Sequence, residues 1–309
     1  FWAAWGGWTM DGMDSFIYAL VLVPALTELL PQSGIAVNPG NLGYYGGVLF
    51  ALFLVGWGLS MVWGPVADRF GRVRTLMLTI LCYSVFTFLG AVATNVWQLA
   101  IFRFLLGLGM GGAWTAGAAL VSESWPARHR GKAIGLMQSA WAIGYGGAAV
   151  LSAIVLPRFG WRAMFFIGGL PALCALFVYR YVEEPAIWKA SKATGKRGGS
   201  LAVIFKSPYR RTTISMVALS LCTLYAYWAF NFWVPSYLLL PTSQHGAGFS
   251  TNTVAMLLVA MNVGGWFGYV TFGYVSDRFG RRPSFTVYLL TAACLVLLYG
   301  ATGSRGLLL

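Results

Sequence analysis

The sequence predicts an all-α membrane protein made of two helical bundles. Of its 309 residues, 58% are hydrophobic and only 9% are charged, whereas a soluble domain carries roughly a quarter charged residues. A charged motif at residues 64–72 returns at residues 273–281, each time between two apolar runs. Runs long enough to cross a bilayer, about 20 residues each, fill most of the chain. The repeated motif indicates that one bundle is a copy of the other.

Nine apolar runs are predicted to be membrane-spanning helices. They lie at 5–30, 43–66, 74–94, 97–121, 132–156, 162–181, 211–240, 251–275 and 284–302. Three of them are slightly long, which a helix accommodates by tilting or by protruding from the bilayer. Spanning β-strands are excluded, because those consist of segments of about ten residues with alternating hydrophobicity.

The longest polar stretch, 183–208, is predicted to be a cytoplasmic linker between the two bundles. It carries several lysines and a Gly-Gly-Ser turn, a composition typical of a connection. The first bundle then covers 1–182 with six helices, and 209–309 begins the second with three. Since residue 1 is not methionine and the last apolar run stops with the chain, we expect a fragment. Three more helices would complete the second bundle.

The basic residues orient the helices. Of the 21 lysines and arginines, 17 fall in loops on one side of the expected membrane and three on the other. Cytoplasmic loops carry such an excess, so this side and the N-terminus are predicted to be cytoplasmic. The protein is expected in the plasma (inner) membrane, with multiple passes. The net charge of +13 then follows from topology, and we expect no nucleic-acid partner.

The repeated motif carries a resemblance to a known family. The three segments concerned are Gly64-x-x-x-Asp68-Arg69-x-Gly71-Arg72, Gly273-x-x-x-Asp277-Arg278-x-Gly280-Arg281 and Arg103-x-x-x-Gly107-x-Gly109-x-Gly111-Gly112. The first two resemble the signature loops between helices 2–3 and 8–9 of the major facilitator superfamily, and the third resembles its helix 4 motif. The resemblance implies the major facilitator fold, two six-helix bundles, of which this chain holds about nine helices.

Further segments resemble two groups of proton symporters within that superfamily. Asp-Gly-Met-Asp at 11–14, Glu-Ser-Trp-Pro at 123–126 and Gly-Trp-Arg at 160–162 resemble the sialate–proton symporters. The first of these is also similar to the aromatic-acid–proton symporters. Both groups imply uptake of an organic acid together with a proton. The Gly-Pro element typical of helix 5 in the antiporter branch is missing from 142–147, which speaks against drug efflux.

Arg103 lies inside a predicted helix, where an arginine costs at least about 2.5 kcal/mol at mid-bilayer. Such a residue usually faces a wet cavity or an anion, and the guanidinium offers a fork of donors for a substrate carboxylate. The alternatives are a structural pair with a neighbouring helix, or a group that tunes the proton affinity of a carboxylate.

Asp11 and Asp14 share one face of the first helix and are predicted to carry the coupled proton. The alternative for Asp11 is a solvated position near the membrane interface. From the rise of a helix, Asp14 lies about 13 Å from the cytoplasmic end and Arg103 about 9 Å from the outer end of its own helix. We therefore expect Asp14 and Arg103 to bracket the midplane rather than touch.

The repeated loops are predicted to be cytoplasmic gates. Asp68 and Asp277 lie near helix N-termini, whose dipoles favour negative charge. The family resemblance implies that Asp277 contacts the fifth helix near Gly131, and that Asp68 contacts a helix outside the fragment. The alternative is that the basic residues of these loops fix topology alone. The gating candidates are Asp68, Arg69, Arg72, Glu123, Arg130, Asp277, Arg278 and Arg281.

Other polar and aromatic residues within helices complete the predicted substrate site. Polar side chains in lipid-embedded helices usually face the protein interior, whereas packing or an interfacial position is the competing interpretation for each aromatic residue. The candidates besides Arg103 are Gln138, Trp141, Tyr225, Asn231 and Asn262. The four glycines that follow Arg103 are predicted to be close-packing residues; they are Gly107, Gly109, Gly111 and Gly112.

These residues predict a secondary active transporter that takes up an organic acid, such as sialate, lactate or an aromatic acid, with a proton by alternating access. The alternatives are a sugar or other metabolite permease of the same fold, and a substrate sensor that does not transport. The expected partners are the acid, the proton and the lipid bilayer, with the chain as a monomer. His129 and His245 lie singly in loops, so no metal site is predicted. No cofactor or enzymatic activity is expected.

Overall fold

The computed structural model describes residues 1–193, 201–239, 242 and 246–301, and every regular element in these ranges is a helix. The all-α prediction is confirmed. The chain divides into two compact units, Phe1–Gly198 with Gly265–Gly273, and Gly199–Gly264 with Tyr274–Leu309. Each unit is described by itself. Residues 194–200 of the predicted linker lie outside the described residues.

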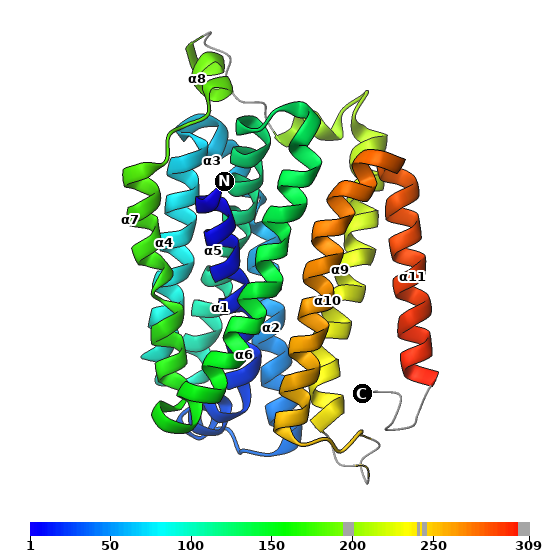
Figure 1. Cartoon of the computed structure of the whole chain (residues 1–309). Helices are drawn as coiled ribbons and strands as arrows, with labels where there is room; N and C mark the ends of the chain where they lie inside the picture. Colours follow the sequence, from blue (N-terminus) through cyan, green and yellow to red (C-terminus); the bar gives the residue numbers. More distant parts are fainter. Residues whose placement is uncertain (194–200, 240–241, 243–245, 302–309) are drawn as a thin grey trace. The chain divides into compact units, whose positions relative to one another are not determined.

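Eight α-helices lie in the described residues of the first unit (Figure 1). They are α1 (Trp2–Gln32), α2 (Pro39–Leu59), α3 (Trp63–Phe70), α4 (Arg72–Ala91), α5 (Val96–Ser124), α6 (Arg130–Gly168), α7 (Pro171–Tyr181) and α8 (Ala186–Ala193). Helix α1 packs along α6, and α5 packs along both α4 and α2. Helix α5 is therefore central to this unit.

The second unit is built from α9 (Arg210–Leu239), α10 (Thr251–Phe279) and α11 (Arg281–Ala301), which follow a 3₁₀ turn at Leu201–Phe205. One segment of α10, Gly265–Gly273, belongs to the first unit. These helices begin within about one turn of the predicted starts, because apolar runs and their polar ends locate spanning helices well.

Polar residues start several helices as the sequence requires. The Asn38 side chain accepts a hydrogen bond from the Asn41 amide at 2.8 Å, and Asn95 accepts one from the Gln98 amide at 2.9 Å. The Ser250 hydroxyl accepts one from the Thr253 amide at 3.2 Å. Each contact satisfies an N–H group that the first helical turn leaves without a backbone partner.

Helix α6 contains the fifth predicted run and the beginning of the sixth, which continues into α7. Its 39 residues would extend about 58 Å if straight, roughly twice the hydrocarbon thickness of a bilayer. The helix is broken at Gly160, where φ is +74° and ψ is −179°, a conformation open to glycine. Figure 1 shows the chain turning back at this point. Counted as continuous helices, eight in the described chain are long and apolar enough to span a membrane. Helix α6 counts once among them, although its two limbs lie in two of the nine predicted runs.

Glycines let the helices of the first unit approach backbone to backbone. A Cβ atom at Gly56 would overlap the Phe104 carbonyl, and one at Gly107 would overlap the Phe53 carbonyl, so α2 and α5 cross where neither has a side chain. The other three glycines predicted to pack closely, Gly109, Gly111 and Gly112, would likewise meet atoms of neighbouring helices at less than 3.0 Å. The close-packing prediction is confirmed for all four.

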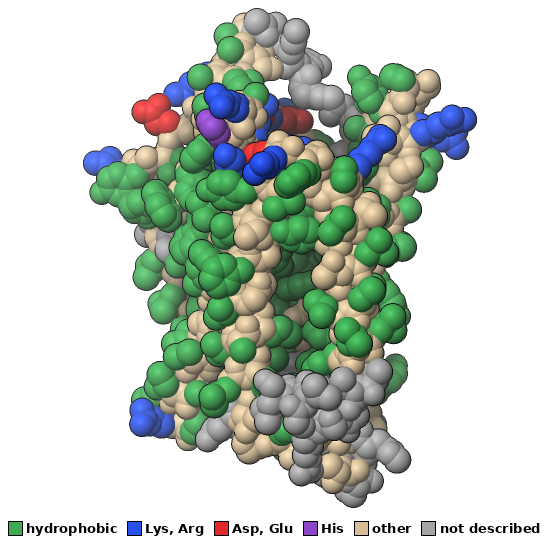
Figure 2. All heavy atoms as spheres, turned by 45° about the vertical axis from the view of Figure 1, so that its right-hand side comes forward, with side chains coloured by type: hydrophobic (Ala, Val, Ile, Leu, Met, Phe, Trp, Pro, Cys, Tyr) green, Lys and Arg blue, Asp and Glu red, His purple; other side chains and the backbone are tan. Residues whose placement is uncertain are grey.

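The surface of the chain has the apolar character that lipid requires. On the face shown in Figure 2, most charged side chains gather near one end, and hydrophobic side chains cover most of the surface between the ends. Large apolar side chains such as Val55, Ile101 and Phe177 are more than half exposed. Such an apolar exterior suits a multi-pass membrane protein, whose helices satisfy their own backbone groups within the bilayer.

Candidate functional site

Asp14 lies in the closed interior of the first unit. The residue is fully buried on α1, and the Thr87 hydroxyl of α4 donates to its Oδ2 at 2.8 Å. Its Oδ1 accepts no hydrogen bond from the described residues. A Cβ atom at Gly168 would lie 2.8 Å from Oδ1, so glycine is needed there to leave room for the carboxylate. A carboxyl group with one bonded and one unpaired oxygen can hold a proton on the second.

Arg103 lies in the same interior and is only 2% exposed. Its guanidinium carbon lies 3.7 Å from the ring centroid of Tyr18 on α1 and 5.1 Å from that of Phe165 on α6. A desolvated cation–π contact contributes about 2 kcal/mol. The Arg103 Nη2 has no hydrogen-bond partner among the described residues. Arg103 is therefore held mainly by the faces of two aromatic rings.

Asp14 and Arg103 interact without touching. Their charges act on each other, yet the ion pairs within 4.0 Å in the described chain include neither residue. This agrees with the expectation that they do not touch. Because charges removed from water interact strongly, protonation of Asp14 changes the electrostatic environment of Arg103.

Asp11 lies one turn before Asp14 and is also fully buried. Its carboxyl group interacts with the Tyr83 hydroxyl of α4 and with the charge of Asp14. The alternative of a solvated, interfacial Asp11 is wrong, because no part of the side chain reaches the surface. Two carboxyl groups of α1 thus share one interior with a single guanidinium.

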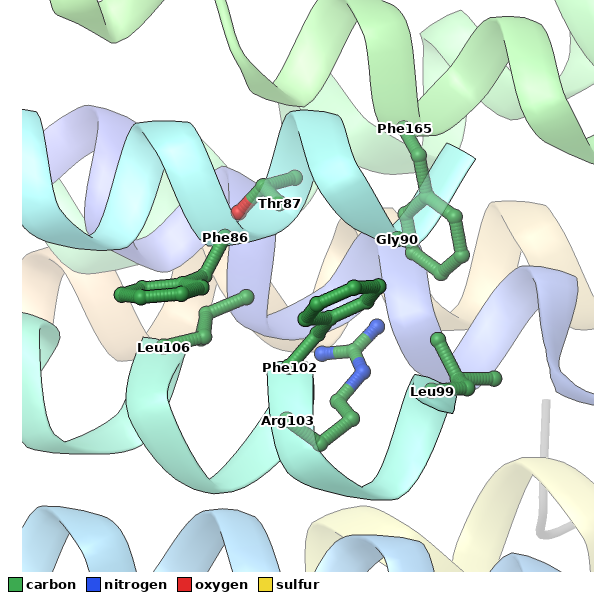
Figure 3. Close-up of a pocket in the computed structure, with 8 residues that line it drawn as sticks. All are labelled: Phe86, Thr87, Gly90, Leu99, Phe102, Arg103, Leu106 and Phe165. Atoms are coloured by element: carbon green, nitrogen blue, oxygen red, sulfur yellow. The ribbon is translucent and has the colours of Figure 1, made fainter. Parts of the chain in front are cut away.

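Arg103 lines a narrow crevice between α4, α5 and the part of α6 that follows Gly160 (Figure 3). The guanidinium points from α5 toward α4, and Phe165 reaches toward it from α6. The crevice is too narrow to admit a water molecule. Direct contact between Arg103 and a substrate carboxylate therefore stays a prediction. The geometry favours the alternative that Arg103 tunes the proton affinity of Asp14.

Gln138 and Trp141 belong to an aromatic cluster on α6. The ring of Trp141 lies 4.8 Å from that of Trp8 and 5.9 Å from that of Trp57, measured between centroids, and the Trp114 indole donates to Gln138 Oε1 at 3.2 Å. Trp141 is 3% exposed, whereas Trp114 is 42% exposed. The cluster thus runs from the interior of the first unit to its surface and offers flat apolar faces with one amide.

The remaining substrate candidates lie on α9 and α10 in the second unit. The Asn231 side-chain amide donates to the Tyr227 carbonyl at 2.9 Å, and that of Asn262 donates to the Leu258 carbonyl at 2.8 Å. Each asparagine thus bonds its own helix one turn back. Tyr225 is 77% exposed. A substrate role for these three residues stays a prediction.

The first copy of the repeated loop forms a charge network. Arg72 donates from Nη1 to Asp68 Oδ1 at 2.6 Å and from Nη2 to Glu123 Oε1 at 2.8 Å. Arg130 donates to the Trp125 carbonyl at 3.2 Å, and Arg69 lies 5.5 Å from the ring centroid of Phe70. Arg72 therefore joins α3, α4 and α5.

Glu184 completes this network and was missed in the sequence, where it lies within the polar linker. Its carboxylate accepts hydrogen bonds from the backbone amides of Arg72, Val73 and Arg74 at 2.7, 3.0 and 3.3 Å. These are the first residues of α4, so Glu184 satisfies the unpaired N–H groups and opposes the helix dipole. The signal in the sequence was two glutamates followed by proline directly after an apolar run.

We expect Gly71→Ala to lower the thermal midpoint of unfolding. Gly71 has φ of +114°, and a Cβ atom there would overlap the carboxylate of Glu184. A non-glycine residue at such a positive φ costs about 1–3 kcal/mol, and a lost cap costs about 0.5–2 kcal/mol. The matched control is Gly64→Ala, because a Cβ atom at Gly64 meets nothing within 4 Å. Equal midpoints for the two variants would contradict the packing of Gly71 against Glu184.

The second copy of the loop repeats the first in backbone detail. Gly280 has φ of +88°, and the Ser284 hydroxyl donates to its carbonyl at 2.8 Å, as the Thr75 hydroxyl does to the Gly71 carbonyl at 2.8 Å. Arg278 lies 5.5 Å from the ring centroid of Phe279, which repeats the contact of the first copy. The local structure therefore supports the internal duplication. The gating roles of Asp277, Arg278 and Arg281 stay predictions.

The sequence of this chain matches a known protein family. The family model described as Major Facilitator Superfamily matches residues 5–309. The bound structure of the proton:xylose symporter XylE superposes with a TM-score of 0.67 at 20% sequence identity, over 91% of this chain and 69% of that one. At this identity the superposition shows the fold alone.

Curated relatives are bacterial transport proteins. A probable 4-methylmuconolactone transporter of Cupriavidus pinatubonensis is 35% identical over 92% of this chain and 64% of its own length. The sialic acid transporter NanX of Escherichia coli is 31% identical over 94% and 67%. A cis,cis-muconate transport protein of Acinetobacter baylyi is 30% identical over 76% and 58%. The chain thus spans about two thirds or less of the length of each relative.

Proposed function

The chain belongs to the major facilitator superfamily of membrane transporters, and we propose that it takes up an organic acid together with a proton. Uptake occurs across the plasma membrane by alternating access, with the N-terminus in the cytoplasm. The arginine-rich loops support this orientation through the excess of positive charge found on cytoplasmic sides.

The observation that carries the proposal is the buried Asp14 beside Arg103. An ionisable residue inside a membrane helix marks an ion or proton pathway by default. Asp14 holds one hydrogen bond from Thr87 and keeps Oδ1 unpaired, while Arg103 supplies a positive charge within interaction range. When Asp14 takes up a proton, Arg103 loses its counter-charge, so protonation of Asp14 changes the electrostatic potential that an anionic substrate meets in the transporter.

The substrate class is supported by the names of the relatives. NanX is named for sialic acid and the Acinetobacter protein for cis,cis-muconate, both of which are carboxylic acids. In the first unit, the aromatic cluster around Trp141 and Gln138 offers apolar faces and an amide, which suit the body of such an acid. Tyr225, Asn231 and Asn262 would contribute from the second unit.

Gating is proposed for the charge network of the first loop. We expect Asp68→Asn to lower the turnover number several-fold while the KM changes less, because a gate acts on the exchange between conformations rather than on substrate binding. Its 38% exposed carboxylate adds only about 0–1 kcal/mol to stability. The check is initial uptake rates in proteoliposomes. An unchanged turnover number would contradict gating by Asp68.

The proposed function is tested by uptake of radiolabelled sialic acid, cis,cis-muconate and D-xylose into proteoliposomes, with and without an inward proton gradient. We expect one of the acids to accumulate only with the gradient, and xylose to stay at the level of empty liposomes. Accumulation of xylose would favour the sugar permease. Saturable binding of an acid without uptake would favour the sensor.

A further inference from the structure

A cluster distant from Asp14 along α1 joins three segments of the first unit. We define the Glu28 cluster as Glu28 on α1, Ala93 in the turn between α4 and α5, and Trp161 with Arg162 after the break in α6. The Trp161 indole donates to Glu28 Oε2 at 2.7 Å, and Arg162 donates to Glu28 Oε1. Arg162 also donates to the Ala93 carbonyl at 3.2 Å. One carboxylate thus fixes the start of the second limb of α6.

The Arg162–Glu28 ion pair contributes little to the stability of the fold by itself. The side chains of Arg162 and Glu28 are 35% and 41% exposed, and such pairs contribute about 0–1 kcal/mol. The indole is different, because Trp161 is only 5% exposed and its hydrogen bond to a carboxylate is charge-assisted. The main consequence of Glu28 is therefore the position of the Trp161 ring.

The Trp161 ring is connected to Arg103 through the ring of Phe165. Phe165 follows one turn later on α6, and the two ring centroids lie 5.7 Å apart at an angle of 87°. Phe165 is also a neighbour of Arg103, whose guanidinium carbon lies 5.1 Å from the centroid of the Phe165 ring (Figure 3). Phe165 is 1% exposed, and a Cβ atom at Gly90 would lie 3.6 Å from its ring. Close packing leaves Phe165 little room to move independently of Trp161.

We propose that Glu28 is a positioning residue for Arg103, acting through Trp161 and Phe165. The carboxylate fixes the indole, the indole fixes the Phe165 ring, and that ring with Tyr18 holds the guanidinium beside Asp14. The consequence for transport rests on the proposed function, since it enters through the effect of Arg103 on Asp14. The geometric part concerns only the place of Arg103 and is measured separately.

The geometric part is tested by ¹⁵N–¹H spectra of the chain in nanodiscs with labelled arginine. The Arg103 Nε–H signal is identified as the one lost in Arg103→Lys, and ring currents of Tyr18 and Phe165 displace it. We expect Glu28→Ala and Trp161→Phe to move this signal, and Glu28→Gln, which keeps an acceptor for the indole, to move it less. The matched control is Arg158→Gln, an exposed arginine near the same break, which should leave the signal in place.

The transport part is tested by the pH profile of cis,cis-muconate and sialic acid uptake. We expect Trp161→Phe to displace the profile of the transported acid, and the same change to add nothing in a Phe165→Leu background, because contacting residues are not additive. An Arg103 signal unmoved in both Glu28→Ala and Trp161→Phe overturns the proposal even if uptake is proton-coupled. A moved signal without uptake of either acid supports the positioning role and contradicts the proposed function instead.

Discussion

Asp14→Asn should abolish accumulation of the acid against its gradient while leaving exchange of labelled for unlabelled acid. Asparagine keeps the size of the side chain and can still accept the hydrogen bond from Thr87, but it cannot take up a proton. Coupling is therefore lost without loss of the fold. We expect accumulation to fall at least about 100-fold, equivalent to about 2.7 kcal/mol, and exchange to change far less. Both are measured in proteoliposomes with an imposed proton gradient.

The matched control for Asp14→Asn is Ser15→Ala. Ser15 is the next residue of α1, is also buried, and donates to the Met110 sulfur at 3.2 Å. Its removal deletes a buried polar group at the same depth without touching a proton carrier. Ser15→Ala should keep proton-driven accumulation. Accumulation that survives in Asp14→Asn would remove Asp14 from the coupling step.

Gly144→Val should prevent the first unit from folding. A Cβ atom at Gly144 would overlap the Thr9 carbonyl of α1, and on the same crossing a Cβ atom at Gly12 would lie 2.8 Å from the Trp141 carbonyl. Backbone atoms cannot move aside as a side chain can, so the cost should reach the upper end of overpacking, about 3 kcal/mol or more. Since α1 carries Asp14, a displaced α1 would also disrupt the site. The measurement is the yield of monodisperse protein in detergent.

The control lies two residues away. Gly146 is on the same helix, and a Cβ atom there meets nothing within 4 Å. Gly146→Val should give normal yield and a thermal midpoint within a few degrees of the parent. Equal losses in both variants would mean that valine is poorly tolerated anywhere in this helix, and would contradict the specific role of the crossing.

The positions of the helices could be predicted from the sequence because a bilayer demands long apolar runs. The break at Gly160 agrees with the sequence, because one predicted run ends at residue 156 and the next begins at residue 162. Asp14 and Arg103 could be singled out because charges in such runs are rare and costly. In each case the lipid environment strongly constrains which residues the sequence contains.

The partners of these residues could not be predicted. Thr87, Tyr18 and Phe165 are ordinary residues of membrane helices, and only the packing of α1, α4, α5 and α6 brings them to Asp14 and Arg103. The place of Arg103 between two rings favours the alternative that it tunes Asp14, while its direct contact with substrate stays a prediction. Glu184 could not be assigned for another reason: the two glutamates before proline mark the end of an apolar run, but they do not show which distant helix such a carboxylate caps.

Proton coupling through Asp14 is tested most directly by the proton flux that accompanies uptake of the acid. Proteoliposomes in weak buffer, without an imposed gradient, receive sialic acid or cis,cis-muconate while an external dye reports pH. We expect alkalinisation of the medium with the transported acid, and none with Asp14→Asn or with empty liposomes. Uptake of the acid with no change of external pH would contradict proton coupling through Asp14.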